Sequence, residues 1–245
     1  MTASQEAGSP TVEPIWYSYS GKEYRGKYPA FFDPREINGL VEIESKFTEI
    51  KSEIEQFLNG RAISSEPYFN TSLVRGEGVW NVIHLYKWGI RDRAICEMLP
   101  LTENALTHIP GFLSAAIARL ATETEILPHL GDTSAVVRCH LGLVIPSPLP
   151  DCGIEVNGES RSWEVGKWIA FCDAHNHRSW NKTKEQRLVL IVDVLLHDYK
   201  ESRQNISKNV LSILELQRQQ LKYPVLKRMP GINLALIRSI NKLRV

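Results

Sequence analysis

Closely spaced strand and turn signals between residues 123 and 196 constrain the fold of this chain more than any other feature. Val136–Ile145 is a long apolar run in which polar residues alternate onto one face. Ile154–Val156 is followed by Asn157-Gly158, a strong signal for a two-residue hairpin. Arg187–Leu196 is mostly Val, Leu and Ile, as in a buried strand. Strands and turns at this density predict a mainly β protein of the jelly-roll type with flanking helices, rather than alternating β/α units.

Two histidines and an arginine stand among these strands. His129 and His177 lie in separate segments, and Arg187 follows His177 by ten residues. Neutral imidazole is a good ligand of Fe(II), and an open site can admit both a chelating substrate and dioxygen. Arginine pairs with both oxygens of a carboxylate at once, and a charge inside an apolar strand is costly unless it is paired. This order suits an open Fe(II) site with a nearby anchor for a dicarboxylate cosubstrate.

Several short blocks then occur in a recognisable order. They are Pro128–Gly131, Arg138–Leu143, Trp163–Lys167, Phe171–His177, Trp180-Asn181 and Arg187. Together they resemble the aspartyl/asparaginyl β-hydroxylases, which are Fe(II)- and 2-oxoglutarate-dependent dioxygenases, over roughly residues 110–198. The resemblance implies a double-stranded β-helix core, related to the cupins, with His129 and His177 as the iron ligands. It also implies that Arg187 binds the distal carboxylate of 2-oxoglutarate, with Arg138 and His140 on the same inward-facing surface near cosubstrate and substrate.

The position two residues after the first histidine is glycine. Most enzymes of this superfamily have a carboxylate there, whereas Gly131 has no side chain to offer, as in the aspartyl hydroxylases proper. We therefore expect a two-histidine site. Asp132 would point away from Gly131 in an extended segment, although a loop could turn it inward. His175, two residues before His177, is either an outer-shell residue or an alternative ligand.

Two departures from the family pattern concern the substrate. Counted without gaps from Pro128, the small hydroxyl residue that helps to hold the cosubstrate in the family is Ala118 here. A basic residue two positions before Arg138 is replaced by Val136. We therefore expect a less acidic substrate than an aspartyl residue, such as a free or carrier-linked amino acid. Even spacing from Arg138 places residue 136 on the same strand face, so Val136→Arg is predicted to improve the binding of acidic ligands.

The composition is that of an ordinary globular protein, with 43% hydrophobic and 23% charged residues. A net charge of +1 gives no argument for binding nucleic acid. The strongly apolar stretches, such as Leu188–Leu196, are too short to span a bilayer, and Met1–Pro14 lacks the pattern of a secretory signal. The four cysteines form no CxxC motif, which favours free thiols in a reducing cytoplasm, where iron would stay ferrous.

Three regions are expected along the chain. Residues 1–14 have little to bury and are expected to be disordered, and residues 15–198 would form the dioxygenase domain, with an aromatic arm and an amphipathic helix at Leu40–Leu58. Residues 199–245 would form a basic helical extension. Its last thirty residues hold seven basic side chains and no acidic one. A solvated face is the default interpretation of this charge, and a homodimer contact, an acidic partner or a membrane surface are the alternatives.

The resemblance implies an oxidoreductase that hydroxylates an unactivated C–H bond of an amino-acid-like or acyl substrate. The reaction would consume dioxygen and decarboxylate 2-oxoglutarate to succinate. The substrate would be a small molecule, an amino acid or a carrier-linked group. Two alternatives stay open: another oxidation by the same site, such as desaturation or cyclisation, and a non-catalytic cupin-like binding module.

Overall fold

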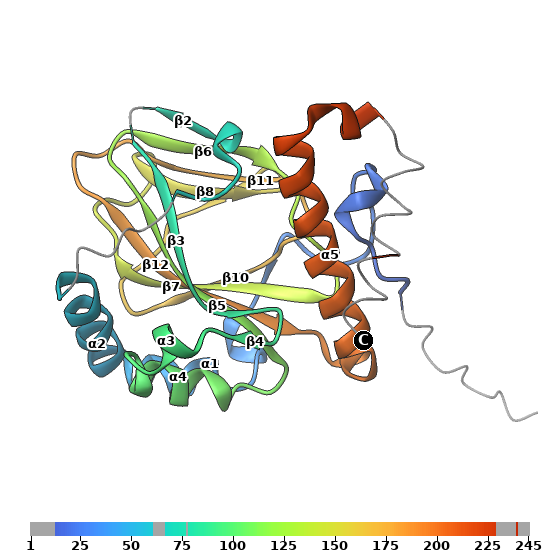
Figure 1. Cartoon of the computed structure of the whole chain (residues 1–245). Coiled ribbons are helices and arrows are strands. Elements are labelled where there is room, and N and C mark those ends of the chain that lie inside the picture. Colours follow the sequence, from blue (N-terminus) through green and yellow to red (C-terminus); the bar gives the residue numbers. More distant parts are fainter. Residues whose placement is uncertain (1–12, 61–66, 77, 229–238, 240–245) are drawn as a thin grey trace, which may run out of the picture.

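Two antiparallel β-sheets form the centre of the molecule (Figure 1). The computed structural model describes residues 13–60, 67–76, 78–228 and 239. One sheet has the strand order β1-β10-β7-β12-β5-β3-β4, and the other has the order β2-β6-β11-β8-β9. The strands are β1 (Phe31–Phe32), β2 (Val74–Gly76), β3 (Trp80–Lys87), β4 (Ile90–Arg91), β5 (Phe112–Leu120), β6 (Thr124–His129), β7 (Val136–Val144), β8 (Cys152–Val156), β9 (Glu159–Arg161), β10 (Trp168–Cys172), β11 (His177–Asn181) and β12 (Arg187–Leu195).

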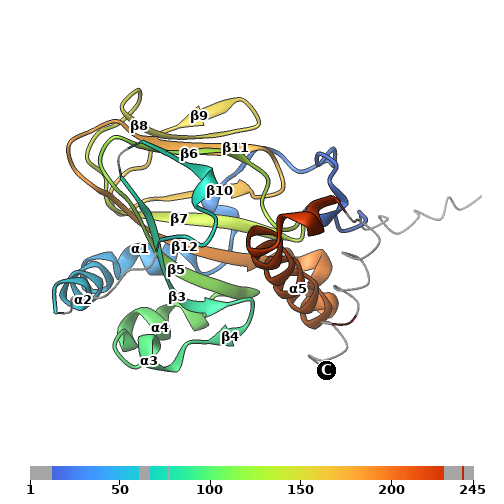
Figure 2. The same cartoon turned by 45° about the horizontal axis from the view of Figure 1, so that its top comes forward.

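The strands from β5 to β12 wind between the two sheets as a double-stranded β-helix. β5, β7, β10 and β12 are neighbours in the larger sheet, and β6, β8, β9 and β11 are neighbours in the smaller one. In the turned view, β8 and β9 form the part of the smaller sheet that lies farthest from helices α1 to α4 (Figure 2). This arrangement is that of a jelly roll and confirms the fold class expected from the sequence.

Side chains on β12 alternate between two environments, because successive residues of a strand point to opposite faces. The even-numbered residues from 188 to 194 join the core under the helices. Val189 and Ile191 face the space between the two sheets. Arg187 and Asp193, at the two ends of the same odd-numbered row, are buried charges. This row therefore lines the interior in which a site can form.

Four short helices cover the outer face of the larger sheet (Figure 1). They are α1 (Leu40–Ser45), α2 (Phe47–Asn59), α3 (Arg93–Cys96) and α4 (Pro100–Thr107). The single helix predicted for Leu40–Leu58 is interrupted at Lys46, whose backbone angles are φ −103° and ψ 12°. The two pieces still bury one apolar face, because Ile43 and Ile50 belong to the same core cluster.

A long helix, α5 (Arg203–Lys222), packs across one end of the barrel (Figure 1). Ile206 and Val210 of this helix are fully buried in a cluster with Val136 of β7. Tyr24 and Tyr28 of the N-terminal aromatic arm pack against the barrel. Residues 1–12 of the expected disordered start, and residues 229–238 and 240–245 of the expected basic extension, lie outside the described residues.

The four cysteines are buried free thiols, as expected. None of the helices in the described ranges is both long and apolar enough to cross a membrane.

Candidate active site

The two predicted iron ligands face each other across a strand pair. His129 ends β6 and His177 begins β11, and their Cα atoms are direct partners in the antiparallel register. Their ring centroids lie 4.2 Å apart. Nδ1 of His129 donates to the carbonyl oxygen of Leu127 at 2.8 Å, and Nδ1 of His177 donates to that of His175 at 2.9 Å. Because a carbonyl oxygen can only accept, each Nε2 keeps a lone pair with which to bind a metal.

Burial keeps both imidazoles neutral. It lowers the pKa of His129 to about 3, with a further contribution from the neighbouring His177. Burial also lowers the pKa of His177 to about 4. Both rings are therefore in their metal-binding form at neutral pH, with no proton to displace.

An aspartate from another loop occupies the space next to Gly131. A Cβ at position 131 would lie 1.9 Å from Oδ2 of Asp173, so only glycine leaves room for this carboxylate. Oδ1 of Asp173 lies 3.7 Å from Nε2 of His177, and Oδ2 accepts a hydrogen bond from the backbone N–H of Asp132 at 3.2 Å. A fully buried carboxylate thus stands beside the two histidines, although it comes from neither position 131 nor position 132.

The two alternative ligands considered from the sequence have other surroundings. Nε2 of His175 bonds to the carbonyl oxygen of Tyr28 at 2.8 Å, and its ring packs against Tyr24. Asp132 lines a neighbouring pocket, where burial and the charge of Asp173 raise its pKa to about 7. Across the part of the chain that the structure describes, no three His, Cys, Asp or Glu side chains meet in a group that could hold a metal ion.

Arg187 is a buried charge without an ion-pair partner among the described residues. The residue is 2% exposed, and its Nε atom has no hydrogen-bond partner. Burial lowers its pKa to about 10. The guanidinium carbon lies 4.7 Å from the ring centroid of Trp163. An unpaired buried charge is expensive, so this position fits a site for an anion.

Further unpaired polar atoms surround this arginine. The ring of His140 is stacked on Trp163 at 6.1 Å, and both of its nitrogens lack a partner, as does Nε1 of Trp163. Ala118, which stands where the family has a hydroxyl residue, is buried in the cluster that contains Trp163. The unpaired donors around Arg187 fit the carboxylate of 2-oxoglutarate, and the two free Nε2 atoms of His129 and His177 fit an iron ion. The residues present therefore fit both groups.

Arg138 has carboxylate partners within the protein. Its Nη1 lies 2.5 Å from Oδ1 of Asp173, and its Nε and Nη2 donate to Asp193 at 2.8 and 3.1 Å. Its charge is therefore offset before any ligand binds. The partner Asp193 was not predicted from the sequence, because only the pairing of β7 with β12 brings the two residues together.

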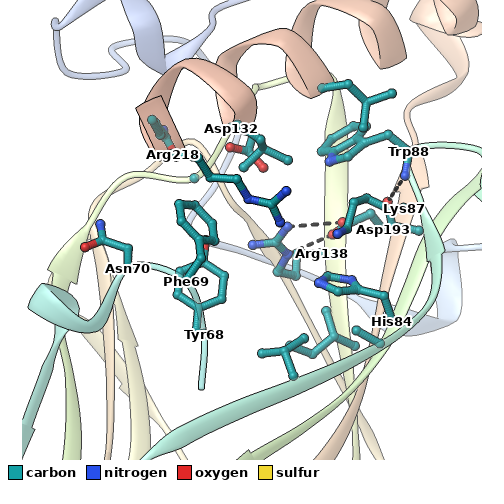
Figure 3. A pocket seen from close by; sticks show the side chains of 18 of the residues that line it. Tyr68, Phe69, Asn70, His84, Lys87, Trp88, Asp132, Arg138, Asp193 and Arg218 are labelled. Carbon is teal, nitrogen blue, oxygen red and sulfur yellow. Dashed lines mark hydrogen bonds and ion pairs between the residues drawn. The ribbon is translucent and has the colours of Figure 1, made fainter. Parts of the chain in front are cut away.

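A pocket of about 410 Å³ opens on the His129 side of the site (Figure 3). Its walls include β3, the segment 68–73 before β2, and Leu211, Leu214 and Arg218 of α5. The contribution of α5 was also missed from the sequence, where this basic segment was interpreted as a solvated face. The spacing of Arg218 from Leu211 and Leu214, at seven and four residues, was the available signal, since it places all three on one helix face.

Val136 does not reach this pocket. It shares a strand face with Arg138, as predicted, but it is 0% exposed and enclosed by α5. An arginine at position 136 would have to disrupt this apolar packing before it could meet a ligand, so the structure gives no support to the prediction that it would improve the binding of acidic ligands.

A family model described as aspartyl/asparaginyl β-hydroxylase matches residues 44–196, which is more than half of the chain. The chain belongs to this family. The aspartyl/asparaginyl β-hydroxylase match includes every predicted site residue and ends before α5.

Individual relatives carry different names. The chain is 29% identical over 170 residues to an ornithine lipid ester-linked acyl 2-hydroxylase of Rhizobium tropici, covering 67% of this chain and 60% of the relative. It is 32% identical over 126 residues to the aspartyl/asparaginyl β-hydroxylase of Homo sapiens, covering 49% of this chain and 16% of the relative. The chain thus spans less than two thirds of the length of either relative.

Solved structures with a similar arrangement include a prolyl-4-hydroxylase from Pseudomonas putida. It has 12% sequence identity and a TM-score of 0.40, covering 60% of this chain and 85% of that one. A viral collagen prolyl hydroxylase from Paramecium bursaria Chlorella virus-1 has 8% identity and a TM-score of 0.36, covering 59% and 90%.

Proposed function

We propose that this chain is an Fe(II)- and 2-oxoglutarate-dependent dioxygenase that hydroxylates an unactivated C–H bond of an amino-acid-like or acyl substrate. The observation that carries the proposal is the buried, unpaired guanidinium of Arg187 in the same barrel as the facing pair His129 and His177. A cation that the protein leaves without a carboxylate is suited to a ligand that brings one.

Each residue has a role that follows from its surroundings. His129 and His177 would hold the iron through Nε2, with both rings oriented by their Nδ1 hydrogen bonds. Arg187 would hold the distal carboxylate of 2-oxoglutarate, and His140 and Trp163 would offer hydrogen bonds beside it. When bound, iron and 2-oxoglutarate supply the oxidising chemistry, in which dioxygen is consumed and 2-oxoglutarate is converted to succinate and carbon dioxide.

Asp173 would favour metal binding through its negative charge, and its position is fixed by other protein residues rather than by the metal. Its carboxylate is held by Arg138 and by the backbone of Asp132, and it adds negative charge beside two neutral rings. Such a charge favours a divalent cation at this position. Arg138 therefore acts here by fixing Asp173, and any direct contact of Arg138 with the cosubstrate would be additional.

The β-barrel and α5 would together form the substrate pocket. We keep residues 15–198 as the catalytic region and propose that the following segment completes the substrate pocket through α5. The names of the relatives indicate two substrate classes, an ester-linked acyl chain and an aspartyl or asparaginyl residue.

Anaerobic titration of the Fe(II)-loaded protein with 2-oxoglutarate tests the proposal. Arg187→Met should weaken cosubstrate binding strongly, since losing a buried charge-assisted pair costs about 2–5 kcal/mol. Arg187→Lys should restore part of the affinity, because lysine keeps the charge without the two-pronged geometry. Arg178→Met is the matched control, because Arg178 is a surface arginine paired with Glu155.

The stability of the Arg187→Met variant shows whether Arg187 binds the cosubstrate or stabilises the fold. Arg187→Met should leave the free protein as stable as the wild type or more stable, because it removes a buried charge without a partner. Unchanged affinity for 2-oxoglutarate in Arg187→Met would overturn the assignment.

A further inference from the structure

The pocket beside His129 carries two cations that have no ion-pair partner among the described residues. Lys87 ends β3, and Arg218 extends from α5 into the pocket (Figure 3). Burial and the charge of Arg218 both lower the pKa of Lys87, and the charge of Asp92 opposes this shift without forming an ion pair. The guanidinium carbon of Arg218 lies 5.2 Å from the ring centroid of Phe69. Two like charges that influence each other in a pocket create a position for an anion.

The acids of the same pocket are already engaged or partly protonated. Asp193 is bonded to Arg138 at 2.8 and 3.1 Å. Burial raises the pKa of Asp132 to about 7, so its charge is incomplete at neutral pH. Glu215 accepts a hydrogen bond from Gln219 at 2.8 Å and makes no ion pair within the described ranges. None of these three acids forms an ion pair with Lys87 or Arg218 among the residues that the structure describes, so both cations remain available to a ligand.

A series of aromatic rings connects this cationic end to the metal-ligand pair. The centroids of Phe69 and Tyr68 are 4.6 Å apart, those of Tyr68 and Trp80 are 4.0 Å apart, and those of Trp80 and His129 are 6.4 Å apart. Together with the contact of Arg218 on Phe69, these rings form a continuous wall from α5 to His129. The ring faces of such a wall can hold an apolar chain, and the unpartnered Nε1 of Trp80 leaves one hydrogen-bond donor beside it.

Further apolar side chains line the pocket beside its polar residues. Leu211 and Leu214 of α5 and Trp88 beside β3 line it, and Ile90 at its edge is 58% exposed. A volume of about 410 Å³ lies within the ordinary range of ligand pockets, roughly 300–1,000 Å³. The pocket thus combines a cationic end with an apolar length.

We infer that Lys87 and Arg218 bind the anionic group of an amphiphilic substrate, a carboxylate or phosphate carried on an apolar chain that runs along the aromatic wall toward His129 and His177. This inference rests on the proposed function, and it assigns the substrate class and two specificity residues. Arg218 lies beyond residues 44–196, the part of the chain that the family model matches.

Binding of simple amphiphiles to the full chain tests this inference without turnover. Decanoate, decyl phosphate and decyltrimethylammonium are titrated anaerobically, each below its critical micelle concentration, and binding is measured by calorimetry. One or both anions should bind the wild type, and their ratio tells a carboxylate site from a phosphate site. Arg218→Gln and Lys87→Gln should each weaken anion binding about tenfold, and Arg218→Glu should reverse the preference toward the cation.

Lys222→Gln is the matched control. It removes one positive charge from the same helix at an exposed position that does not line the pocket, and it should leave anion affinity within about twofold of the wild type. Equal binding of the cationic and anionic amphiphiles, or equal anion affinity in the wild type and Arg218→Gln, would overturn the inference. If 2-oxoglutarate binds through Arg187 and neither anion binds, this inference alone is wrong. If an anion binds through Arg218 and 2-oxoglutarate does not bind, the proposed function is wrong and the anion site stands.

Discussion

At the scale of single residues, the lack of a side chain at Gly131 gives the Asp173 carboxylate its place beside the two histidines. A Cβ there would lie 1.9 Å from Oδ2 and 2.5 Å from the backbone oxygen of Asp173. Gly131→Ala should therefore destabilise the protein by roughly 1–3 kcal/mol, as overpacking does, and weaken Fe(II) binding. Urea unfolding and anaerobic metal titration measure the two effects.

Gly60→Ala is the control for that substitution. Gly60 has a φ of −76°, and its added Cβ would have one near neighbour, the oxygen of Gln56 at 3.1 Å. Its cost should stay below about 1 kcal/mol. If Gly131→Ala were as well tolerated as Gly60→Ala, the close approach of Asp173 would not hold in solution.

Iron binding should depend on the two histidines rather than on Asp132. His129→Ala or His177→Ala should abolish stoichiometric Fe(II) binding, because each removes one of two protein ligands. Asp132→Ala should keep a metal site, since Asp132 contacts Asp173 through its backbone N–H, which alanine retains. Metal content after anaerobic loading and desalting measures this. Complete loss of iron in Asp132→Ala would indicate a conventional facial triad instead.

At the scale of elements, the packing of α5 against β7 sets the surroundings of Val136. Val136→Arg would bury a charge in an apolar cluster with Ile206 and Val210, so it should destabilise the protein by about 3 kcal/mol or more. The control Val41→Arg is at a position that is 52% exposed and should change stability by less than about 0.5 kcal/mol. Equal unfolding midpoints of the two variants would contradict this packing.

The strands were predictable because their signals are local. The run from Val136 became β7, and Asn157 and Gly158 form the predicted hairpin turn with φ values of 49° and 83°. The family resemblance implied that His129 and His177 share one site. The antiparallel register of β6 with β11 places the two residues opposite each other. The interruption of the predicted helix at Lys46 was not predictable, because the apolar spacing continues through it.

The partners that complete the site depend on contacts between residues far apart in the chain. Asp193 meets Arg138 across 55 residues of sequence, and Asp173 meets it across 35. The helix face of α5 that carries Arg218 looks like an ordinary charged face until the barrel beneath it is known. Periodicity identifies such a face but does not say what it covers.

At the scale of the whole molecule, buried neutral histidines predict that the metal-free protein loses stability in acid. The pKa is lowered to about 3 at His129 and to about 4 at His177 and His84, against about 6.5 in an unfolded chain. The unfolded state thus binds more protons between about pH 6.5 and pH 4, so stability falls as the pH falls through this window. Asp132 acts in the opposite direction, because its pKa is raised to about 7.

Burial also lowers the pKa of His140, while that of Asp193 is raised, so the lowered histidine pKa values outnumber the raised aspartate ones and stability should rise with pH across this window. Urea unfolding of the metal-free protein at several pH values between 7 and 4.5 measures the slope. His84→Asn should reduce the slope by about 1.4 kcal/mol per pH unit without removing a metal ligand. An unchanged slope in that variant would contradict the burial of a neutral His84.

The most direct test of the central claim follows oxygen and 2-oxoglutarate in one reaction. The Fe(II)-loaded protein is given 2-oxoglutarate, isotopically labelled dioxygen and a panel of amino-acid-like and acyl substrates, and the products are analysed by mass spectrometry. We expect one substrate to gain a single labelled oxygen atom, with an equal amount of succinate formed and neither product in His129→Ala or Arg187→Met. Oxygen insertion without succinate, or full product formation in Arg187→Met, would contradict the account.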